Sequence, residues 1–408
     1  MSNGSCDQCG ISPRAIIPAE RTRNVEYAIR DIAVEAEKVR RQGHKILPLN
    51  IGDPLKYDFR TPLHMIEACH QAMLDQHNGY SGSNGTDEAV EAIRREANRK
   101  GIRDIRSIFV STGASEAIEL CLTALVNPGD NVLLPSPGYP LYTAVMEKLQ
   151  AESRHYLLDE DHDWRPDVAD MAAKIDDRTK AICLINPNNP TGALYRREAL
   201  LQVIELARRN HLPIFSDEIY DKMVFDGQEH LSTASLADDV GFVTFNGLSK
   251  SYLVPGWRIG WAVVSGPEEI MGDFNEAIHK FVRARLCANH PLQFAIRPAL
   301  EGDQSHLADV NARLTQRRDY TIERLNAIPG ISCVKPEGAF YAFPRLHIPM
   351  EDKEFTLRIL HECHVLVVHG SGFGQKPGTR HFRVVTLPDM ATLESAYDKL
   401  DRFMKNLA

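Results

Sequence analysis

The chain has 408 residues, of which 43% are hydrophobic and 25% charged, and its formal net charge is −8. A chain of this length and composition can bury a large core and is long enough for two domains. The negative charge and the lack of a block rich in lysine and arginine argue against nucleic acid or an anionic membrane surface as a partner. Because the sequence has no run of apolar residues long enough to span a membrane and no signal-like N-terminus, we expect a cytoplasmic protein.

Eight cysteines are spread along the chain. Most, such as Cys121 and Cys183, stand in apolar runs, which is typical of small buried side chains and not of a disulfide framework. Cys6 and Cys9 have the C-x-x-C spacing of some metal and redox sites, but no second pair with ligand spacing accompanies them. We therefore expect a disordered N-terminal tail and no metal site.

Strand and helix signals alternate from residue 62 to residue 290. The alternation predicts a large α/β domain with a mostly parallel sheet flanked by helices. Within it, residues 108–110 predict a strand and residues 116–126 an amphipathic helix. Further on, residues 338–343 and 381–385 predict strands, and residues 293–325 are largely helical in pattern.

The turn between the first strand and its helix is built from small residues, Ser111 to Ser115, with Gly113 at its centre. A strand that enters a helix through such a turn leaves unpaired backbone N–H groups, which can bind an anion. An ordinary helix N-cap, with Ser111, Thr112 or Ser115 as the capping residue, is the alternative interpretation.

Two later strands lead into polar residues. The strand at 182–185 runs into N-P-N-N-P-T-G, so that Asn189 follows a strand end, and the strand at 214–217 ends on Asp217, with Tyr220 three residues later. Ligands bind at the carboxyl ends of strands in open α/β sheets, and a carboxylate there can keep a pyridine nitrogen protonated. A chain-reversing loop at Asn189, an N-capping Asp217 and a half-buried Tyr220 are the alternatives.

Lys250 stands in the segment N-G-L-S-K-S-Y-L-V-P-G-W-R-I-G, which ends at residue 260. A lysine amine can form a Schiff base with a carbonyl. Ser249 offers a hydroxyl, and Arg258 can bind a phosphate with its planar fork of donors. An aldehyde that also carries a phosphate fits this combination, and pyridoxal 5'-phosphate (PLP) has both groups.

Five motifs occur in order over roughly 150 residues: T-G-A-S-E-A, P-S-P-G-Y, N-P-N-N-P-T-G, S-D-E-I-Y and S-K-S-Y…G-W-R-I-G. Together they resemble the fold-type I PLP-dependent aminotransferases of class I/II, and the resemblance covers nearly the whole chain. Within that family N246-G-L-S-K, R285-L-C-A-N289 and N24-V-E-Y-A-I-R30 are most similar to the bacterial glutamate–pyruvate (alanine) aminotransferases. The resemblance implies a smaller α+β domain formed by residues 1–61 and 291–408.

The resemblance assigns a role to each matching position. Lys250 would be the Schiff-base lysine and the base that moves the proton. Asp217 would bind the pyridine nitrogen, and Tyr220 and Asn189 the ring oxygen. The other cofactor-binding residues implied are Gly113, Ala114, Ser115, Tyr139, Ser249, Arg258 and, from the partner subunit of a homodimer, Tyr80.

Arg383 matches the arginine that binds the substrate α-carboxylate, with Gly52 and Asn189 completing the clamp. Tyr27 is expected to line the side-chain pocket, and Arg283 or Arg285 is a candidate for the distal carboxylate of glutamate. The activity implied is amino-group exchange between a small amino acid, with alanine as the expected donor, and 2-oxoglutarate by a ping-pong mechanism. Transamination of aspartate, branched-chain or aromatic amino acids, or a lyase reaction on the same fold, is the alternative.

Overall fold

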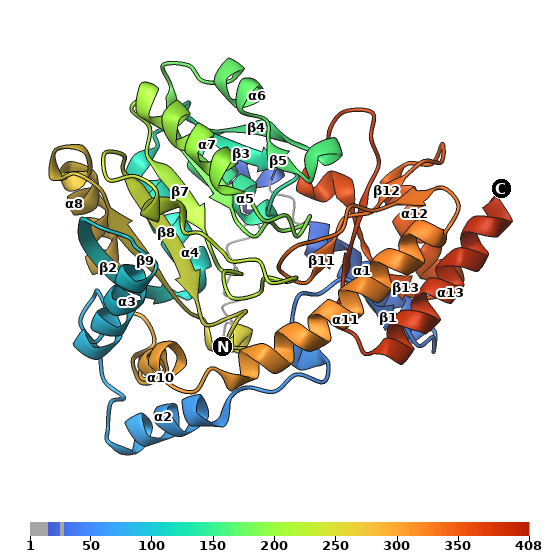
Figure 1. Ribbon diagram of the computed structural model, residues 1–408, viewed down its shortest axis with the longest axis horizontal. Coiled ribbons are helices and arrows are strands. Elements are labelled where there is room, and N and C mark those ends of the chain that lie inside the picture. The colour runs from blue at the N-terminus through green and yellow to red at the C-terminus, as the bar shows by residue number, and fades with distance from the viewer. Residues whose placement is uncertain (1–14, 25–27, 408) are drawn as a thin grey trace, which may run out of the picture.

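A computed structural model describes residues 15–24 and 28–407. Its central element is an eight-stranded sheet in the order β2-β9-β8-β7-β6-β3-β4-β5 (Figure 1). Strands β8, β7, β6, β3 and β4 are parallel to one another, while β9 is antiparallel to both of its neighbours and β5 is antiparallel to β4. The strands are β2 (Ile105–Thr112), β3 (Asn131–Ser136), β4 (Glu152–Asp159), β5 (Arg165–Pro166), β6 (Thr179–Ile185), β7 (Ile214–Asp217), β8 (Phe242–Gly247) and β9 (Ile259–Ser265).

Helices cover both faces of this sheet, which explains why its central strands β7 and β8 are buried along their whole length. Successive side chains of a strand point to opposite faces, so Ile182 and Leu184 belong to one core while Cys183 and Ile185 belong to the other. The first core includes residues of α3 (Asp87–Arg99), α6 (Val168–Ala173), α7 (Arg197–Arg209) and α10 (Ile296–Glu301); the second includes residues of α4 (Gly113–Leu125), α5 (Pro140–Leu149) and α8 (Glu268–Ala284).

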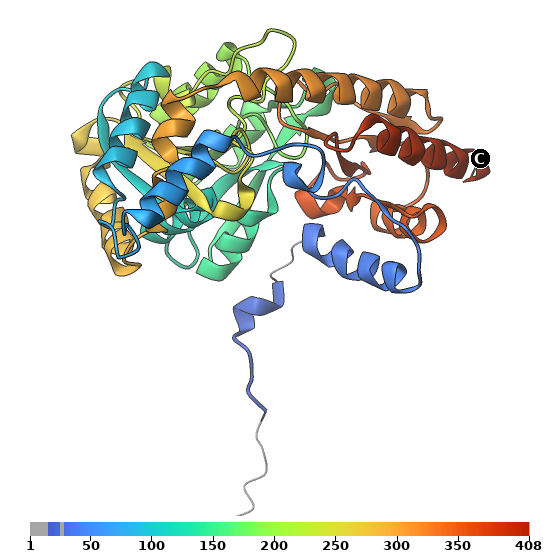
Figure 2. The same cartoon turned by 90° about the horizontal axis from the view of Figure 1, so that it is seen from below.

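A smaller part of the molecule contains three short sheets and a separate apolar core. Strand β1 (Leu47–Pro48) pairs with β13 (Val365–Leu366), β10 (Ile331–Ser332) with β12 (Arg345–Leu346), and β15 (Phe382–Val385) lies between β11 (Tyr341–Ala342) and β14 (Val368–His369). Its helices are α1 (Ala28–Arg41), α12 (Asp352–Arg358) and α13 (Met390–Leu407), and α11 (Ser305–Ala327) runs between the two parts (Figure 2).

The remaining elements are short or lie at the edge of the large sheet. Helices α9 (His290–Gln293) and α10 pack on α2 (Leu63–Leu74). The short 3-10 or π segments are η1 (Glu20–Asn24), η2 (Pro54–Lys56), η3 (Glu160–His162), η4 (Thr233–Ser235), η5 (Pro255–Trp257), η6 (Ile359–Cys363) and η7 (Gly370–Phe373). The division into domains at residues 61/62 and 290/291 stays a prediction.

The α/β fold predicted from the sequence is confirmed, and two local predictions need correction. The helix expected to begin at Glu116 begins at Gly113, directly after β2. The strand expected at 338–343 is limited to Tyr341–Ala342, because Ala339 adopts a left-handed backbone with φ of 56° that interrupts the extended chain.

Candidate active site

A cavity of about 630 Å³ lies at the carboxyl ends of β6 and β7, beside the first turn of α4. Its size is typical of a small-molecule site, and its place is the one where open α/β sheets bind ligands. Both parts of the molecule contribute to its wall. The predicted residues that line it are Gly52, Ala114, Ser115, Tyr139, Asn189, Asp217, Tyr220, Ser249, Lys250, Arg258 and Arg383.

Lys250 follows β8 and brings its amine into this cavity. Its Nζ donates a hydrogen bond to the carbonyl of Gly52 at 2.9 Å and lies 5.6 Å from the centre of the Phe340 ring. Burial, followed by the positive charge of Arg383 and then that of Arg258, lowers the pKa of the amine to about 8, against the opposing effect of nearby carboxylates. About a tenth of the amine is therefore neutral, and nucleophilic, at pH 7.

Asp217 is the last residue of β7 and is only 4% exposed. Alternation along β7 puts Asp217 on the same side as Phe215, which packs in the core beneath α4 and α5. Its carboxylate accepts hydrogen bonds from the backbone N–H of Ile219 at 3.2 Å and the hydroxyl of Tyr142 at 3.4 Å. Burial raises the pKa of Asp217 to about 6, so a cationic partner in the cavity would be strongly favoured.

The first turn of α4 and Arg258 form a cradle suited to an anion. Gly113 has φ of 74°, and a Cβ at this position would collide with the guanidinium of Arg258. That guanidinium donates to the carbonyl of Pro255 at 3.0 Å and to that of Thr112 at 3.5 Å, which orients it over the helix start. Helix N-terminal N–H groups together with an arginine favour a phosphate, so these residues fit the phosphate of PLP.

Arg383, on β15, is 1% exposed and also lines the cavity. It donates to the side-chain oxygen of Asn189 at 3.1 Å and to the carbonyl of Asn50 at 2.6 Å. Its guanidinium carbon lies 4.6 Å from the ring centres of both Tyr341 and Phe373. Contacts on several sides hold the guanidinium in one orientation, as a bidentate carboxylate site requires.

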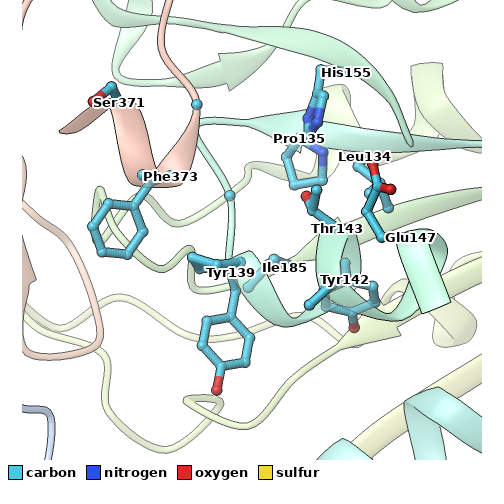
Figure 3. A pocket seen from close by; sticks show the side chains of 15 residues that line it. Leu134, Pro135, Tyr139, Tyr142, Thr143, Glu147, His155, Ile185, Ser371 and Phe373 are labelled. Carbon is cyan, nitrogen blue, oxygen red and sulfur yellow. The ribbon is translucent and has the colours of Figure 1, made fainter. Parts of the chain in front are cut away.

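A second cavity of about 250 Å³ adjoins the first, and Tyr139 and Ile185 line both. Figure 3 shows the rings of Tyr139 and Phe373 on one side of it and His155 and Glu147 on the other. Phe373, which lines the second cavity, contacts Arg383, which lines the first.

Several predicted residues do not line the cavity of this chain. Tyr80 is 83% exposed, so its expected place in a partner's site stays a prediction. Arg283 is exposed and pairs with Glu276 at 2.8 Å, and Arg285 donates to the carbonyl of Ser83 at 3.1 Å. Predictions for Tyr27, Cys6 and Cys9 fall outside the described residues.

Among the residues that the sequence predictions missed, three make hydrogen bonds to predicted site residues. Tyr341 lines the cavity with its hydroxyl 2.8 Å from that of Tyr220, Tyr142 contacts Asp217, and the carbonyl of Asn50 binds Arg383. A tyrosine within the apolar run at 338–343 was the available signal for Tyr341, because a buried phenol needs a partner. A backbone carbonyl such as that of Asn50 has no signal in sequence.

In the described part of the chain, no cluster of three or more histidine, cysteine or acidic residues is arranged to hold a metal ion. Over the same residues, none of the helices combines the length and apolar character needed to cross a membrane.

Comparison with known proteins identifies the family. The model of the family "Aminotransferase class I and II" matches residues 44–400. The chain is 41% identical to the glutamate-pyruvate aminotransferase AlaA of Escherichia coli (strain K12) over 95% of this chain and 97% of that protein. It is 43% identical to the alanine aminotransferase of Mycobacterium tuberculosis (strain H37Rv), over 96% of this chain and 93% of that one.

Solved structures agree with the sequence comparisons. The structure of an alanine aminotransferase from Pyrococcus furiosus superposes with a TM-score of 0.93 at 45% identity, covering 96% of this chain and all of that one. An aminotransferase from Escherichia coli gives a TM-score of 0.92 at 41% identity, over 96% of this chain and 99% of that one. Enzymes of this family and fold depend on PLP in general. The chain belongs to the class I and II aminotransferases and has their fold-type I architecture.

Proposed function

We propose that this chain is a PLP-dependent alanine aminotransferase that exchanges an amino group between alanine and 2-oxoglutarate in a ping-pong cycle. The observation that carries the proposal is the amine of Lys250, whose pKa is lowered to about 8 in a cavity that also holds Asp217, Arg383 and the anion cradle at Arg258. A cytoplasmic homodimer, with Tyr80 completing the partner's site, is part of the same proposal.

The residues of the cavity match the chemical groups of the cofactor. The phosphate would be held by Arg258, Ser249 and the α4 start at 113–115, and the pyridine nitrogen by Asp217. Tyr220 and Asn189 would donate to the ring oxygen, and Tyr139 would cover a ring face. When bound, PLP supplies an electron sink for the charge that develops at the substrate Cα.

Arg383 would bind the substrate α-carboxylate through two parallel hydrogen bonds. With the carboxylate held and the amino group directed to the cofactor, the position of the Cα–H bond relative to Lys250 is set. The Lys250 amine would remove the proton from the substrate Cα and then donate it to the carbon that bore the aldehyde of the cofactor. Its lowered pKa suits both tasks, because an efficient acid–base group titrates near the working pH.

Alanine and glutamate are proposed as amino donors because the relatives described above are named for these substrates. Two groups could accept the distal carboxylate of glutamate, Arg283 and Arg285, and both stay predictions. A partner subunit would have to bring either of them to the cavity.

A single-turnover screen tests the proposal. The purified PLP form is mixed with one amino acid at a time, without a keto acid, and both the cofactor absorbance and the keto acid released are measured. Alanine is expected to change the spectrum and release close to one pyruvate per active site, and glutamate to release one 2-oxoglutarate. Lys250→Ala serves as the control and is expected to release neither.

The alternatives predict different outcomes in the same screen. Conversion only by aspartate, branched-chain or aromatic amino acids would keep transamination and reject alanine as the donor. Repeated turnover of one amino acid without a keto acid would indicate a lyase. Absence of any conversion would reject transamination.

A further inference from the structure

Tyr341 lines the cavity. It is 3% exposed and lies on β11, where it is paired with Val385 of β15. Arg383 lies two residues before Val385 on β15, so the side chains of Arg383 and Val385 point to the same face of the strand. Tyr341 and Arg383 are therefore diagonal neighbours on one face of this small sheet, within reach of each other.

The contacts of Tyr341 connect two parts of the site. Its ring centre lies 4.6 Å from the guanidinium carbon of Arg383. Its hydroxyl is 2.8 Å from the hydroxyl of Tyr220, and the two rings meet edge to face with centres 5.7 Å apart. One side chain thus contacts both the proposed carboxylate-binding arginine and a proposed cofactor-binding tyrosine.

Gly52 leaves the space that the Tyr341 hydroxyl fills. A Cβ at Gly52 would collide with that hydroxyl, while the carbonyl of Gly52 accepts the hydrogen bond from Lys250. The absence of a side chain at Gly52 therefore lets the Tyr341 hydroxyl and the Lys250 amine approach the same short segment of backbone.

We propose that Tyr341 is a positioning residue for the aminotransferase reaction: its hydroxyl orients the hydroxyl of Tyr220, and its ring holds the guanidinium of Arg383. The inference rests on the proposed function for the identity of the reaction, but its geometry is independent of which amino acid is the substrate.

The hydroxyl role follows from the donor capacity of a phenol. Each tyrosine hydroxyl has one proton to donate and can also accept. When Tyr341 donates to Tyr220, the Tyr220 proton is left to point into the cavity, where the ring oxygen of PLP would accept it. Burial raises the pKa of Tyr220 well above its ordinary value, so Tyr220 stays protonated and able to donate. An accepted hydrogen bond also strengthens the one that Tyr220 donates.

The two roles can be separated by substitution. Tyr341→Phe removes the hydroxyl and keeps the ring, whereas Tyr341→Leu removes both. Tyr397→Phe is a matched control, because Tyr397 is also a buried tyrosine that loses one hydrogen bond, donated to Thr321 at 3.1 Å in the core of the smaller part. Tyr220→Phe and the double variant with Tyr341→Phe complete a mutant cycle.

Three measurements apply to each variant: the pH midpoint of the bound-cofactor absorbance, the affinity of the cofactor-free protein for PLP, and KM for alanine. For Tyr341→Phe we expect a midpoint raised by about 0.5 unit and PLP affinity lowered about fivefold, as for the loss of one hydrogen bond, with KM within about twofold of wild type. The midpoint rises because the hydrogen bond from Tyr220 to the ring oxygen becomes weaker. The ring oxygen then keeps more negative charge and holds a nearby proton more strongly.

Tyr341→Leu is expected to raise KM for alanine about tenfold, since Arg383 loses one of its two aromatic neighbours. The double variant is expected to match Tyr220→Phe in midpoint and affinity, because Tyr341 acts through Tyr220.

Equal midpoints and PLP affinities in Tyr341→Phe and Tyr397→Phe would overturn the hydroxyl role. A tenfold rise of KM already in Tyr341→Phe, which keeps the ring, would overturn the assignment of Arg383 positioning to the ring alone. This test can be made even if Tyr341→Leu fails to fold. Midpoint and PLP affinity do not depend on the amino acid used. A wild-type enzyme that rejects alanine would therefore contradict the proposed substrate while leaving the hydroxyl test intact.

Discussion

The lowered pKa of Lys250 leads to a prediction that can be checked without cofactor or substrate. Burial and the charges of Arg383 and Arg258 lower this pKa from 10.5 to about 8. The amine should therefore gain reactivity as pH rises through about 8, where an ordinary lysine is still almost fully protonated. The perturbation is pH itself, applied to the cofactor-free protein.

The expected magnitude follows from the two pKa values. At pH 7 about 9% of an amine with a pKa of about 8 is neutral, against about 0.03% for one with a pKa of 10.5. The neutral fraction of Lys250 thus exceeds that of an unperturbed lysine roughly 300-fold at this pH. Since only the neutral amine is nucleophilic, its labelling rate should show an advantage of the same order where the amine is accessible to the reagent.

Competitive labelling measures this directly. Trace acetic anhydride is added to cofactor-free enzyme at a series of pH values, and peptide mass spectrometry compares the acetylation of Lys250 with that of Lys148, whose side chain is 56% exposed. Lys250→Ala identifies the peptide. Arg383→Gln is expected to raise the midpoint, because it removes the charge that, after burial, most lowers this pKa.

A labelling midpoint for Lys250 at pH 10 or above would refute the reasoning. So would a midpoint near 8 that does not move in Arg383→Gln, because the electrostatic contribution would then be absent.

Three further predictions concern the residues around Lys250. In Gly113→Ala, the new Cβ displaces the guanidinium of Arg258, and we expect PLP affinity to fall about tenfold or more, about 1.4 kcal/mol, in an equilibrium titration; unchanged affinity would contradict the cradle. Burial raises the pKa of Asp217 to about 6, so the PLP affinity of the wild type should decline as pH falls below 6 and the carboxylate is protonated. Asp217→Asn should instead bind PLP weakly at every pH between 5 and 8. Equal pH profiles for the two proteins would reject the role of Asp217 in binding the pyridine nitrogen. Lys100→Met leaves the carboxylate of Asp221 buried without the ammonium that pairs with it, so the free energy of unfolding should drop by about 3–5 kcal/mol in chemical denaturation, and a drop below about 1 kcal/mol would show that the pair contributes little.

Much of the fold and of the candidate site could be predicted because the information is local. Apolar runs bounded by turn residues located β2, β6 and β7, and the structure confirms these strands. The carboxyl ends of neighbouring parallel strands meet at one edge of a sheet. Asn189 and Asp217 were each expected at such a strand end, and because β6 and β7 are neighbours in the sheet both line the same cavity.

Local pattern failed where backbone conformation departs from regular geometry. The start of α4 at Gly113 and the short β11 both involve a residue with positive φ, Gly113 in one case and Ala339 in the other. A glycine in the sequence indicates that such a backbone is possible. An alanine gives no such indication, because the left-handed conformation of an alanine is stabilised only by its surroundings.

The sequence alone determined the family motifs, the sheet and the identity of the lysine. Tertiary structure decided what those residues can do. The pKa of Lys250 depends on burial and on the charge of Arg383, which arrives from another part of the chain. Tyr341 meets Arg383 and Tyr220 only through the pairing of β11 with β15 and the docking of that sheet against the large one. Electrostatic and packing energies depend on distances between atoms remote in sequence, and only the folded chain sets those distances.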